Sequence, residues 1–347
     1  MKPVDRAMQA SLHLTGFPKP VRSRAEFRSA CRARDLASAH YLFNPRVRLI
    51  DVGWYIDPQT NEPIVGDLRV RVHVRQQPRG AAFEAFSERH RELVIDKERI
   101  PFPVDLVEAD YRLQWFGYPL WPSSPRSRIF NPLRGGISIS NEWSLHSGTL
   151  GGLVKDRERG GEMILSNWHV LAGSAYARKG LRIYQPGYAD GGQFQHTIAL
   201  LERHAMNQGV DAAVARLTDA RPWINDQLDV GPISGITAPT LGMRVIKSGF
   251  GSDVTEGMID GVEGEYPIEY GGFMRKIKHV YRIVPVTPGR VVSQGGDSGS
   301  WWLEKDTRRA VALHFAGYDW PETALAIAMP QVLDALGVDI AAGLEHG

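Results

Sequence analysis

The chain of 347 residues contains a single cysteine, Cys31, so no disulfide can form within it. Secreted proteins often depend on disulfides, and one cysteine cannot build a cysteine-rich zinc site. No spacing typical of metal ligands and no glycine loop that cradles phosphate stands out, so neither a metal nor another cofactor is expected. The scarcity of cysteine favours a reducing compartment.

The sequence also lacks a long apolar run and an excess of charge. No stretch approaches the roughly 18 apolar residues of a membrane span, and the first 20 residues lack the apolar core of a signal peptide. The 41 basic and 39 acidic residues give a net charge of +2, which argues against a nucleic-acid partner. We therefore expect a cytoplasmic protein that contacts neither membranes nor nucleic acids.

Length and patterning predict two domains, because a single hydrophobic core seldom grows this large. Residues 22–42 carry apolar positions at helical spacing among five arginines, which predicts an amphipathic helix with a solvated basic face; a polyanion site is the alternative. Strands are predicted over 47–56, 68–74 and 104–107, and a helix over 81–93. Residues 1–118 are thus expected to form a small α+β domain.

The run over 68–74 alternates apolar residues with Arg69, Arg71 and His73. Such alternation predicts a strand with one buried face and one solvated face.

The second half of the chain has a different pattern. Residues 119–134 hold four prolines and three serines, a composition that predicts a linker. Short strand-like runs between glycine turns then continue to Pro330, which suits a pair of β-barrels. A last helix is predicted over 330–336, with Gly337 at its end. Residues 135–347 are therefore expected to form a mainly β domain.

The most informative segment is 293–300, which reads Ser-Gln-Gly-Gly-Asp-Ser-Gly-Ser. Ser298 has little bulk around it, so its hydroxyl can protrude while backbone N–H groups turn toward one point. Acyl transfer through a serine needs such a nucleophile beside preorganised oxyanion donors. Ordinary surface turns have the same composition. A catalytic role for Ser298 therefore also requires a base and an acid that orients this base.

Two upstream residues are candidates for these roles. His169 follows a short apolar run and precedes one helical turn, so it is expected at the end of a strand. Asp211 opens an apolar run, and a buried carboxylate needs a partner such as an imidazole N–H. Alone, each is better explained as a structural residue. The order His169, Asp211, Ser298 differs from that of α/β-hydrolases, where serine comes first, and it favours the catalytic interpretation.

The motifs Ser-Asn-x-His-Val-Leu-Ala, Asp-Ala-Ala-Val-Ala and Gly-Asp-Ser-Gly-Ser resemble those of bacterial trypsin-like serine peptidases with the chymotrypsin fold. Segments 132–139, 147–151, 245–249 and 255–257 are similar to those of cytosolic-type bacterial members with an extra N-terminal domain, related to plant narrow-leaf trypsin-like proteins. The resemblance covers roughly residues 45–345. It implies a chymotrypsin-like double β-barrel with a C-terminal helix, and a serine endopeptidase that needs no cofactor.

Carried over to this chain, the resemblance makes Ser298 the nucleophile, His169 the general base and acid, and Asp211 the orienting carboxylate. The backbone N–H groups of Gly296 and Ser298 would form the oxyanion hole. Asp297 would brace this loop and should find a positive or donor-rich partner. The substrate would be a protein or peptide, and the N-terminal domain could bind a regulatory partner.

The resemblance places the floor of the specificity pocket near Val292 and Ser293. No aspartate stands there, which argues against cleavage after arginine or lysine. One wall would be residues 310–317, in which His314 and Gly317 match the His-x-x-Gly of glutamyl endopeptidases and picornaviral cysteine proteases. There the histidine binds a Glu or Gln side chain before the scissile bond. The alternative is that His314 is a structural residue.

Activation is where the chain departs from secreted relatives. Those free an N-terminus whose ammonium pairs with the aspartate before the nucleophile, but the matching residues 136–139 lie in mid-chain. We expect an internal group to brace Asp297; the alternative is an inactive precursor that is cut at Arg134–Gly135. The alternative, non-enzymatic function is that of a peptide-binding scaffold on a protease fold. The presence of all three triad residues argues against it.

Overall fold

The structure, a computed structural model, describes residues 24–57, 59–60, 63–75, 93–95, 98–100, 102–114, 116–117, 124–319 and 322–341. The described residues form two compact units. The first draws on Met1–Tyr111, Pro239–Met243 and Met258–Val284, and the second on Arg112–Ala238, Arg244–Gly257 and Pro285–Gly347. Both units are discontinuous in sequence, so the division into 1–118, 119–134 and 135–347 stays a prediction.

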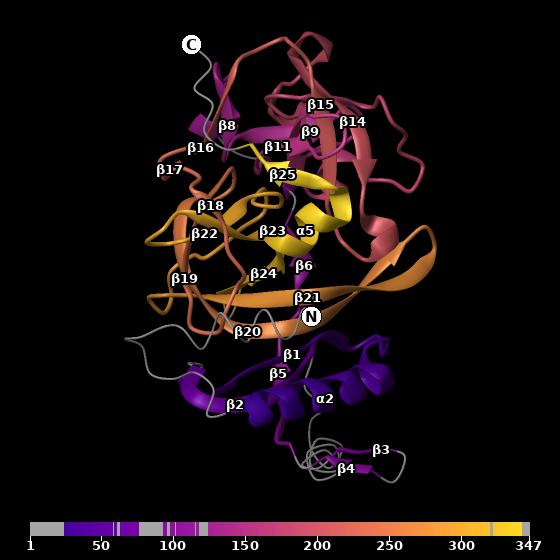
Figure 1. Ribbon diagram of the computed structural model, residues 1–347, viewed down its shortest axis with the longest axis vertical. Coiled ribbons are helices and arrows are strands. Elements are labelled where there is room, and N and C mark those ends of the chain that lie inside the picture. The colour runs from indigo at the N-terminus through magenta and orange to yellow at the C-terminus, as the bar shows by residue number, and fades with distance from the viewer. Residues whose placement is uncertain are drawn as a thin grey trace. The chain divides into compact units, whose positions relative to one another are not determined.

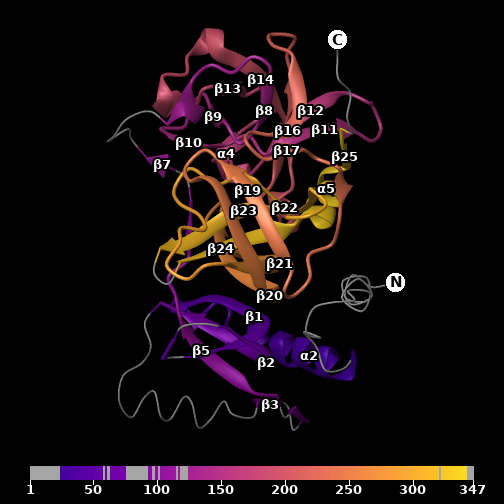
Figure 2. The ribbon, with the colours of Figure 1, turned by 90° about the vertical axis from the view of Figure 1, so that its left-hand side faces the viewer.

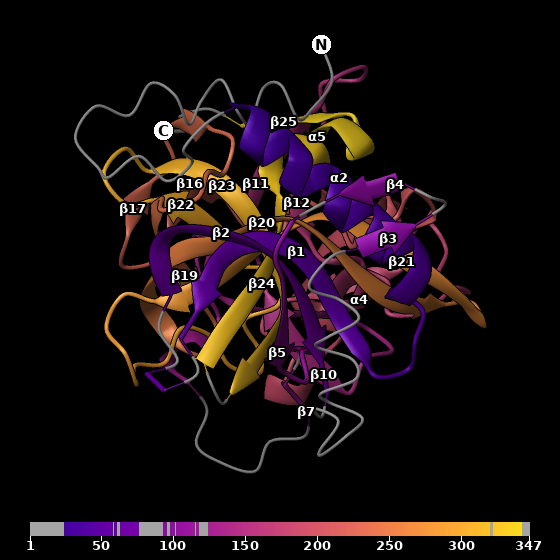
Figure 3. The ribbon, with the colours of Figure 1, turned by 90° about the horizontal axis from the view of Figure 1, so that it is seen from below.

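The first unit combines one helix with a small sheet. Helix α2 (Arg24–Tyr41) packs against β1 (Val47–Ile56) and β2 (Pro63–Val74), which are antiparallel (Figures 1 and 3). Strand β5 (Val104–Glu108) runs parallel to β2, and β1 also pairs with β20 (Asp253–Tyr270). The helix predicted over 22–42 and the strands predicted over 47–56, 68–74 and 104–107 are confirmed.

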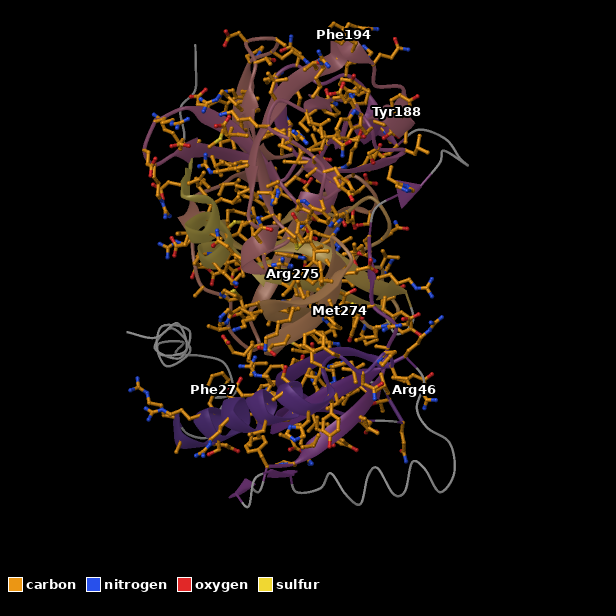
Figure 4. All side chains as sticks on the ribbon, turned by 90° about the vertical axis from the view of Figure 1, so that its right-hand side faces the viewer. Phe27, Arg46, Tyr188, Phe194, Met274 and Arg275 are labelled. Atoms are coloured by element: carbon orange, nitrogen blue, oxygen red, sulfur yellow. The ribbon has the colours of Figure 1, made fainter. Side chains whose placement is uncertain are left out.

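Helix α2 buries an apolar face that includes Phe27, labelled in Figure 4, and Ala30. Arg28 and Arg32 are exposed, as predicted, but Arg34 is buried and donates to the Glu263 carbonyl. The predicted helix over 81–93 lies outside the described residues, apart from its last residue, which begins a short strand, β3.

Strand β2 differs from its sequence prediction on the polar face. Arg71 and His73, expected in solvent, are fully buried. The Arg71 guanidinium donates to Asp51 at 2.8 Å and to Asp260 at 3.0 Å. Arg282 pairs with the same Asp260 carboxylate. Two carboxylates compensate the buried arginine, and the alternation of residue types in β2 could not reveal them because both come from other strands.

Replacing Arg71 with methionine is expected to lower the free energy of unfolding by about 3–5 kcal/mol, because the buried Asp51 carboxylate loses its guanidinium partner and Asp260 keeps only Arg282. Chemical denaturation followed by circular dichroism measures the loss. Arg69→Met is the matched control on the same strand: its partner Asp67 is 38% exposed, so about 1 kcal/mol or less is expected. Equal losses in the two variants would contradict a buried ionic network.

The second unit contains a closed β-barrel. Its pairings run β9–β10, β11–β12, β12–β15, β15–β14, β14–β13 and β13–β9 (Figure 2). Since β10 continues into β11 through Leu150 and Gly151, these pairings form a complete ring. The strands are β9 (Ser138–Asn141), β10 (His146–Thr149), β11 (Gly152–Asp156), β12 (Glu162–Ser166), β13 (Arg182–Tyr184), β14 (Thr197–His204) and β15 (Ala213–Leu217).

A second sheet of this unit contains β19 (Arg244–Gly249), β22 (Trp301–Glu304), β23 (Arg309–Asp319) and β24 (Glu322–Ala328), antiparallel in that order. Two short strands join β23. They are β18 (Gly235–Ile236), which is parallel to it, and β6 (Arg112–Leu113), which is antiparallel. Strand β20 begins in this unit and β21 (Phe273–Pro285) ends in it.

The chain then forms helix α5 (Met329–Leu336), capped by Gly337 at a left-handed φ of +63°, and β25 (Val338–Ile340) returns to β11. The remaining elements are short. They are β3 (Leu93–Ile95), β4 (Glu98–Ile100), β7 (Phe116–Gly117), β8 (Leu133–Gly135), α4 (Trp168–Leu171), β16 (Trp223–Gln227) and β17 (Gly231–Pro232).

The predicted fold class is confirmed: the chain is mainly β, with chymotrypsin-like β-barrel sheets, a C-terminal helix and a small α+β N-terminal part. Within the described ranges, no helix has the length and apolarity needed to cross a membrane.

Candidate active site

His169 and Asp211 stand at neighbouring strand ends. Ser166 at the end of β12 pairs with Ala213 at the start of β15, which brings the two adjoining loops together. The imidazole Nδ1 lies 2.5 Å from Asp211 Oδ2, and the His169 backbone N–H donates to Oδ1 at 3.1 Å. The Asn167 amide donates to the Asp211 carbonyl and holds the loop. A carboxylate that accepts from Nδ1–H fixes the tautomer in which Nε2 takes up a proton.

Ser298 lies in the loop before β22 and is anchored to both sheets. Its carbonyl accepts from the Thr149 N–H at 2.7 Å, and the next residue donates to the His314 carbonyl at 3.0 Å. The Ser298 hydroxyl donates to the Phe315 carbonyl at 3.1 Å. Gly299 has a φ of +98°, and a Cβ there would lie 2.0 Å from Ser166 Oγ. Only glycine therefore allows the serine to stand this close to the first barrel.

The predicted oxyanion donors converge on one acceptor. The N–H groups of Gly296 and Ser298 both donate to the backbone carbonyl of Gln114, at 2.8 and 3.2 Å. Gly296 adopts a φ of +97°, and its own carbonyl accepts from Thr149 Oγ1 at 2.8 Å. This arrangement holds both donors toward a single carbonyl oxygen, as stabilisation of an oxyanion requires.

Asp297 is fully buried, and Lys247 on β19 is its positive partner. Lys247 Nζ lies 2.7 Å from Oδ2, and the backbone N–H groups of Gly251, Ser252 and Gln294 also donate to the carboxylate. Burial alone would raise the pKa of Asp297, but the charge of Lys247 holds it below its ordinary value. Burial in turn lowers the pKa of Lys247. An internal ammonium thus braces the loop.

Lys247 was not singled out by sequence reasoning, although it directly follows the apolar residues Val245 and Ile246 in a strand. With this lysine in place, Asp297 has a partner without a new N-terminus. The other possibility, a cut at Arg134–Gly135, falls inside β8, which is paired with β16. Leu133 and Gly135 are buried there, so a protease would have to unpair the strand first.

His314 is fully buried in β23 and binds a glutamine side chain. Its Nε2 lies 2.7 Å from Gln114 Oε1. An amide oxygen only accepts, so Nε2 carries the proton. Burial, with a contribution from the charge of Lys247, lowers the pKa of His314 to about 3, so the ring is neutral at neutral pH. Gly317 also lies beside this glutamine, since a Cβ on it would lie 2.3 Å from the Gln114 amide nitrogen, but its place in a specificity pocket stays a prediction.

Val292 and Ser293, predicted at the pocket floor, are both buried. The Val292 carbonyl accepts from Thr255 Oγ1 at 2.8 Å, which fixes the backbone ahead of the oxyanion loop. Among the described residues, Ser293 Oγ has no hydrogen-bond partner. Their place at the floor stays a prediction.

Gln114 is the second site residue that sequence reasoning missed, after Lys247. It precedes the predicted linker and lies outside every motif of the resemblance. No local pattern distinguishes it from the other glutamines of the chain, so only the path of the backbone reveals its position. Among the parts of the chain that the structure describes, no cluster of three or more His, Cys, Asp or Glu side chains could hold a metal ion.

No family model and no curated protein matches the chain. Similar solved structures include protease A of Thermobifida fusca, 16% identical over 61% of this chain and 100% of that chain, with a TM-score of 0.44. A Nocardiopsis protease is 16% identical over 60% of this chain and 98% of that chain, with a TM-score of 0.44. A glutamic-acid-specific serine protease, described as binding substrate through a histidine triad, is 19% identical over 60% of this chain and 100% of that chain, with a TM-score of 0.45.

Proposed function

We propose that the chain is a serine endopeptidase with Ser298 as its nucleophile, His169 as its base and Asp211 as the orienting carboxylate. One observation carries the proposal: the N–H groups of Gly296 and Ser298 bind a single carbonyl oxygen, and the second of these donors belongs to the candidate nucleophile itself. The His169–Asp211 pair, buried at the ends of two paired strands, supplies the proton acceptor that this chemistry needs.

In the proposed reaction Ser298 Oγ forms an ester with the substrate carbonyl carbon. Its proton passes to His169 and from there to the leaving amine, and Asp211 stabilises the imidazolium. The two backbone donors bind the developing oxyanion; losing one such donor typically lowers turnover by about 10²–10³-fold. A water molecule, deprotonated by His169, then hydrolyses the ester and restores the serine. No cofactor takes part.

We also propose that the primary pocket selects glutamine. The neutral His314 ring donates through Nε2–H, which matches an amide oxygen. A glutamate carboxylate would enter this buried pocket beside a neutral ring and would carry an uncompensated charge, which is costly. The side chains of arginine and lysine offer no acceptor to His314. The small Gly317 leaves the room that a long side chain needs.

Peptides that differ only in the residue before the scissile bond test the proposal. We expect kcat/KM for glutamine to exceed that for glutamate by at least about tenfold at neutral pH, and arginine and lysine to be poorer still. His314→Leu should lower kcat/KM about 10–100-fold for the glutamine peptide but much less for a matched methionine peptide. A preference for arginine would contradict the pocket assignment, and a folded protein that cleaves no peptide would contradict the endopeptidase.

The proposal includes two further points that came from the sequence. A cytoplasmic location is supported by the single cysteine. Regulation through the N-terminal part is supported by the boundary between the units, which falls at Tyr111–Arg112, three residues before the Gln114 carbonyl that binds the Gly296 and Ser298 N–H groups.

A further inference from the structure

Two short segments of the chain itself, residues 112–114 and 116–117, bind to strands and loops of the candidate active site. Before residue 115, strand β6 pairs antiparallel with β23, which also carries His314. After residue 115, strand β7 pairs antiparallel with β10, the strand that ends at Thr149 (Figure 2). The paired residues are Leu113–Ala316, Arg112–Gly317, Phe116–Ser147 and Gly117–His146.

Gln114 is held at the point between these two strands by four hydrogen bonds. Its N–H donates to the Phe315 carbonyl at 3.3 Å, and its carbonyl accepts from Gly296 and Ser298. Its side chain reaches His314, and the residue is only 6% exposed. The N–H, the carbonyl and the side chain of Gln114 are therefore all hydrogen-bonded. This is how we expect the substrate residue before a scissile bond to be bound.

We infer that the peptide bond between Gln114 and Trp115 is a substrate of the chain's own active site. The inference rests on the proposed endopeptidase function. The carbonyl that meets both N–H donors belongs to Gln114, so the serine attacks that carbon and no other. Residues 112–113 and 116–117 are bound by strand pairing, the mode in which a peptide is recognised by strand addition.

In this reaction the C–N bond of Gln114–Trp115 breaks and an ester forms between the Gln114 carbonyl carbon and Ser298 Oγ. The serine proton passes through His169 to the Trp115 nitrogen, which leaves as an amine. Water then hydrolyses the ester, giving a carboxylate on Gln114 and returning the proton to the serine. The uncut chain holds the Ser298 hydroxyl on the Phe315 carbonyl, so attack begins with rotation of this side chain toward His169.

A bound inhibitory segment would make the same contacts, but such segments resist cleavage when their two ends stay covalently linked after the cut. With a single cysteine, no disulfide can tie the ends on either side of residue 115. The fragment that ends at Gln114 nevertheless stays associated, because its strand β1 pairs with β20 of the other fragment. The cut is therefore visible only under denaturing conditions.

Intact-mass spectrometry of the denatured full-length chain, sampled over time, tests the inference. We expect fragments 1–114 and 115–347 that together weigh one water more than the chain. Ser298→Ala should stay whole, and Gln114→Leu should be cut at least about a hundredfold more slowly because its side chain cannot accept from His314. Gln195→Leu, at an exposed glutamine of the same unit, is the matched control and should be cut like wild type. A first-order rate independent of protein concentration identifies cleavage within one chain.

Each other result has a distinct meaning. A wild-type chain that hydrolyses a glutamine peptide but keeps its 114–115 bond overturns the inference and leaves the proposed function standing. A folded chain that cleaves neither overturns the proposed function as well. A cut at another bond, or one that persists in Ser298→Ala, also overturns the inference. If Gln114→Leu does not fold, Gln114→Glu replaces it, with cleavage at least about tenfold slower at neutral pH.

Discussion

Lys247→Met is expected to remove most peptidase activity and to lower the free energy of unfolding by about 3–5 kcal/mol. The substitution leaves Asp297 fully buried without its ammonium partner. An uncompensated carboxylate in this loop will either take up a proton or move toward water. Both changes disturb the loop that holds Gly296 and Ser298, so kcat/KM should fall by about 10²–10³-fold, as for the loss of an oxyanion donor.

Denaturant unfolding and peptide hydrolysis measure the two effects separately. Lys305→Met is the control, because Lys305 pairs with Glu256 where both side chains are about one-third exposed, and a loss of about 1 kcal/mol or less is expected. The double variant Lys247→Met, Asp297→Leu removes both charges and should regain part of the stability but not the activity. Full activity in Lys247→Met would contradict the bracing role of this lysine.

His169→Ala is expected to lower kcat by about 10⁶-fold, because the serine loses the group that takes its proton. Asp211→Asn should cost about 10⁴-fold, since an amide cannot hold the imidazole in the productive tautomer. The Asp211 carboxylate also accepts from the His169 backbone N–H, so both the ring and its loop depend on it. Steady-state hydrolysis of a glutamine peptide, with long incubations for the variants, gives the ratios.

His40→Ala, at an exposed histidine of α2, is the control and should change kcat less than twofold. Circular dichroism of each variant separates lost chemistry from lost folding. If His169→Ala retained even a tenth of the wild-type rate, the imidazole would not be the base.

Local sequence predicted the elements on which the candidate triad stands. The apolar run before His169 forms β12, the run after Asp211 forms β15, and the glycines around Ser298 allow its tight loop. These features are local, because strand propensity and left-handed glycines act within a few residues. The amphipathic helix α2 and the capped helix α5 could be predicted for the same reason.

The partners of buried charges could not be predicted, because they arrive from distant strands. Arg71 in β2 has the sequence pattern of a solvent-facing residue. Its buried partner Asp260 lies nearly two hundred residues away in the sequence and comes beside it only in the folded chain. Lys247 meets Asp297 only when β19 and the loop before β22 pack together. Gln114 is the extreme case, because only the path of the folded backbone brings its carbonyl to the N–H groups of Gly296 and Ser298.

The central claim is that Ser298 is an activated nucleophile, and covalent labelling tests it most directly. Wild type and Gln114→Gly, which removes the side chain bound to His314, are treated with a fluorophosphonate and mapped by peptide mass spectrometry. We expect one adduct, on Ser298, absent from Ser298→Ala and unchanged in Ser234→Ala, at an exposed serine of the same unit. If both folded proteins remain unlabelled, or if the adduct lies on another residue, the account is contradicted.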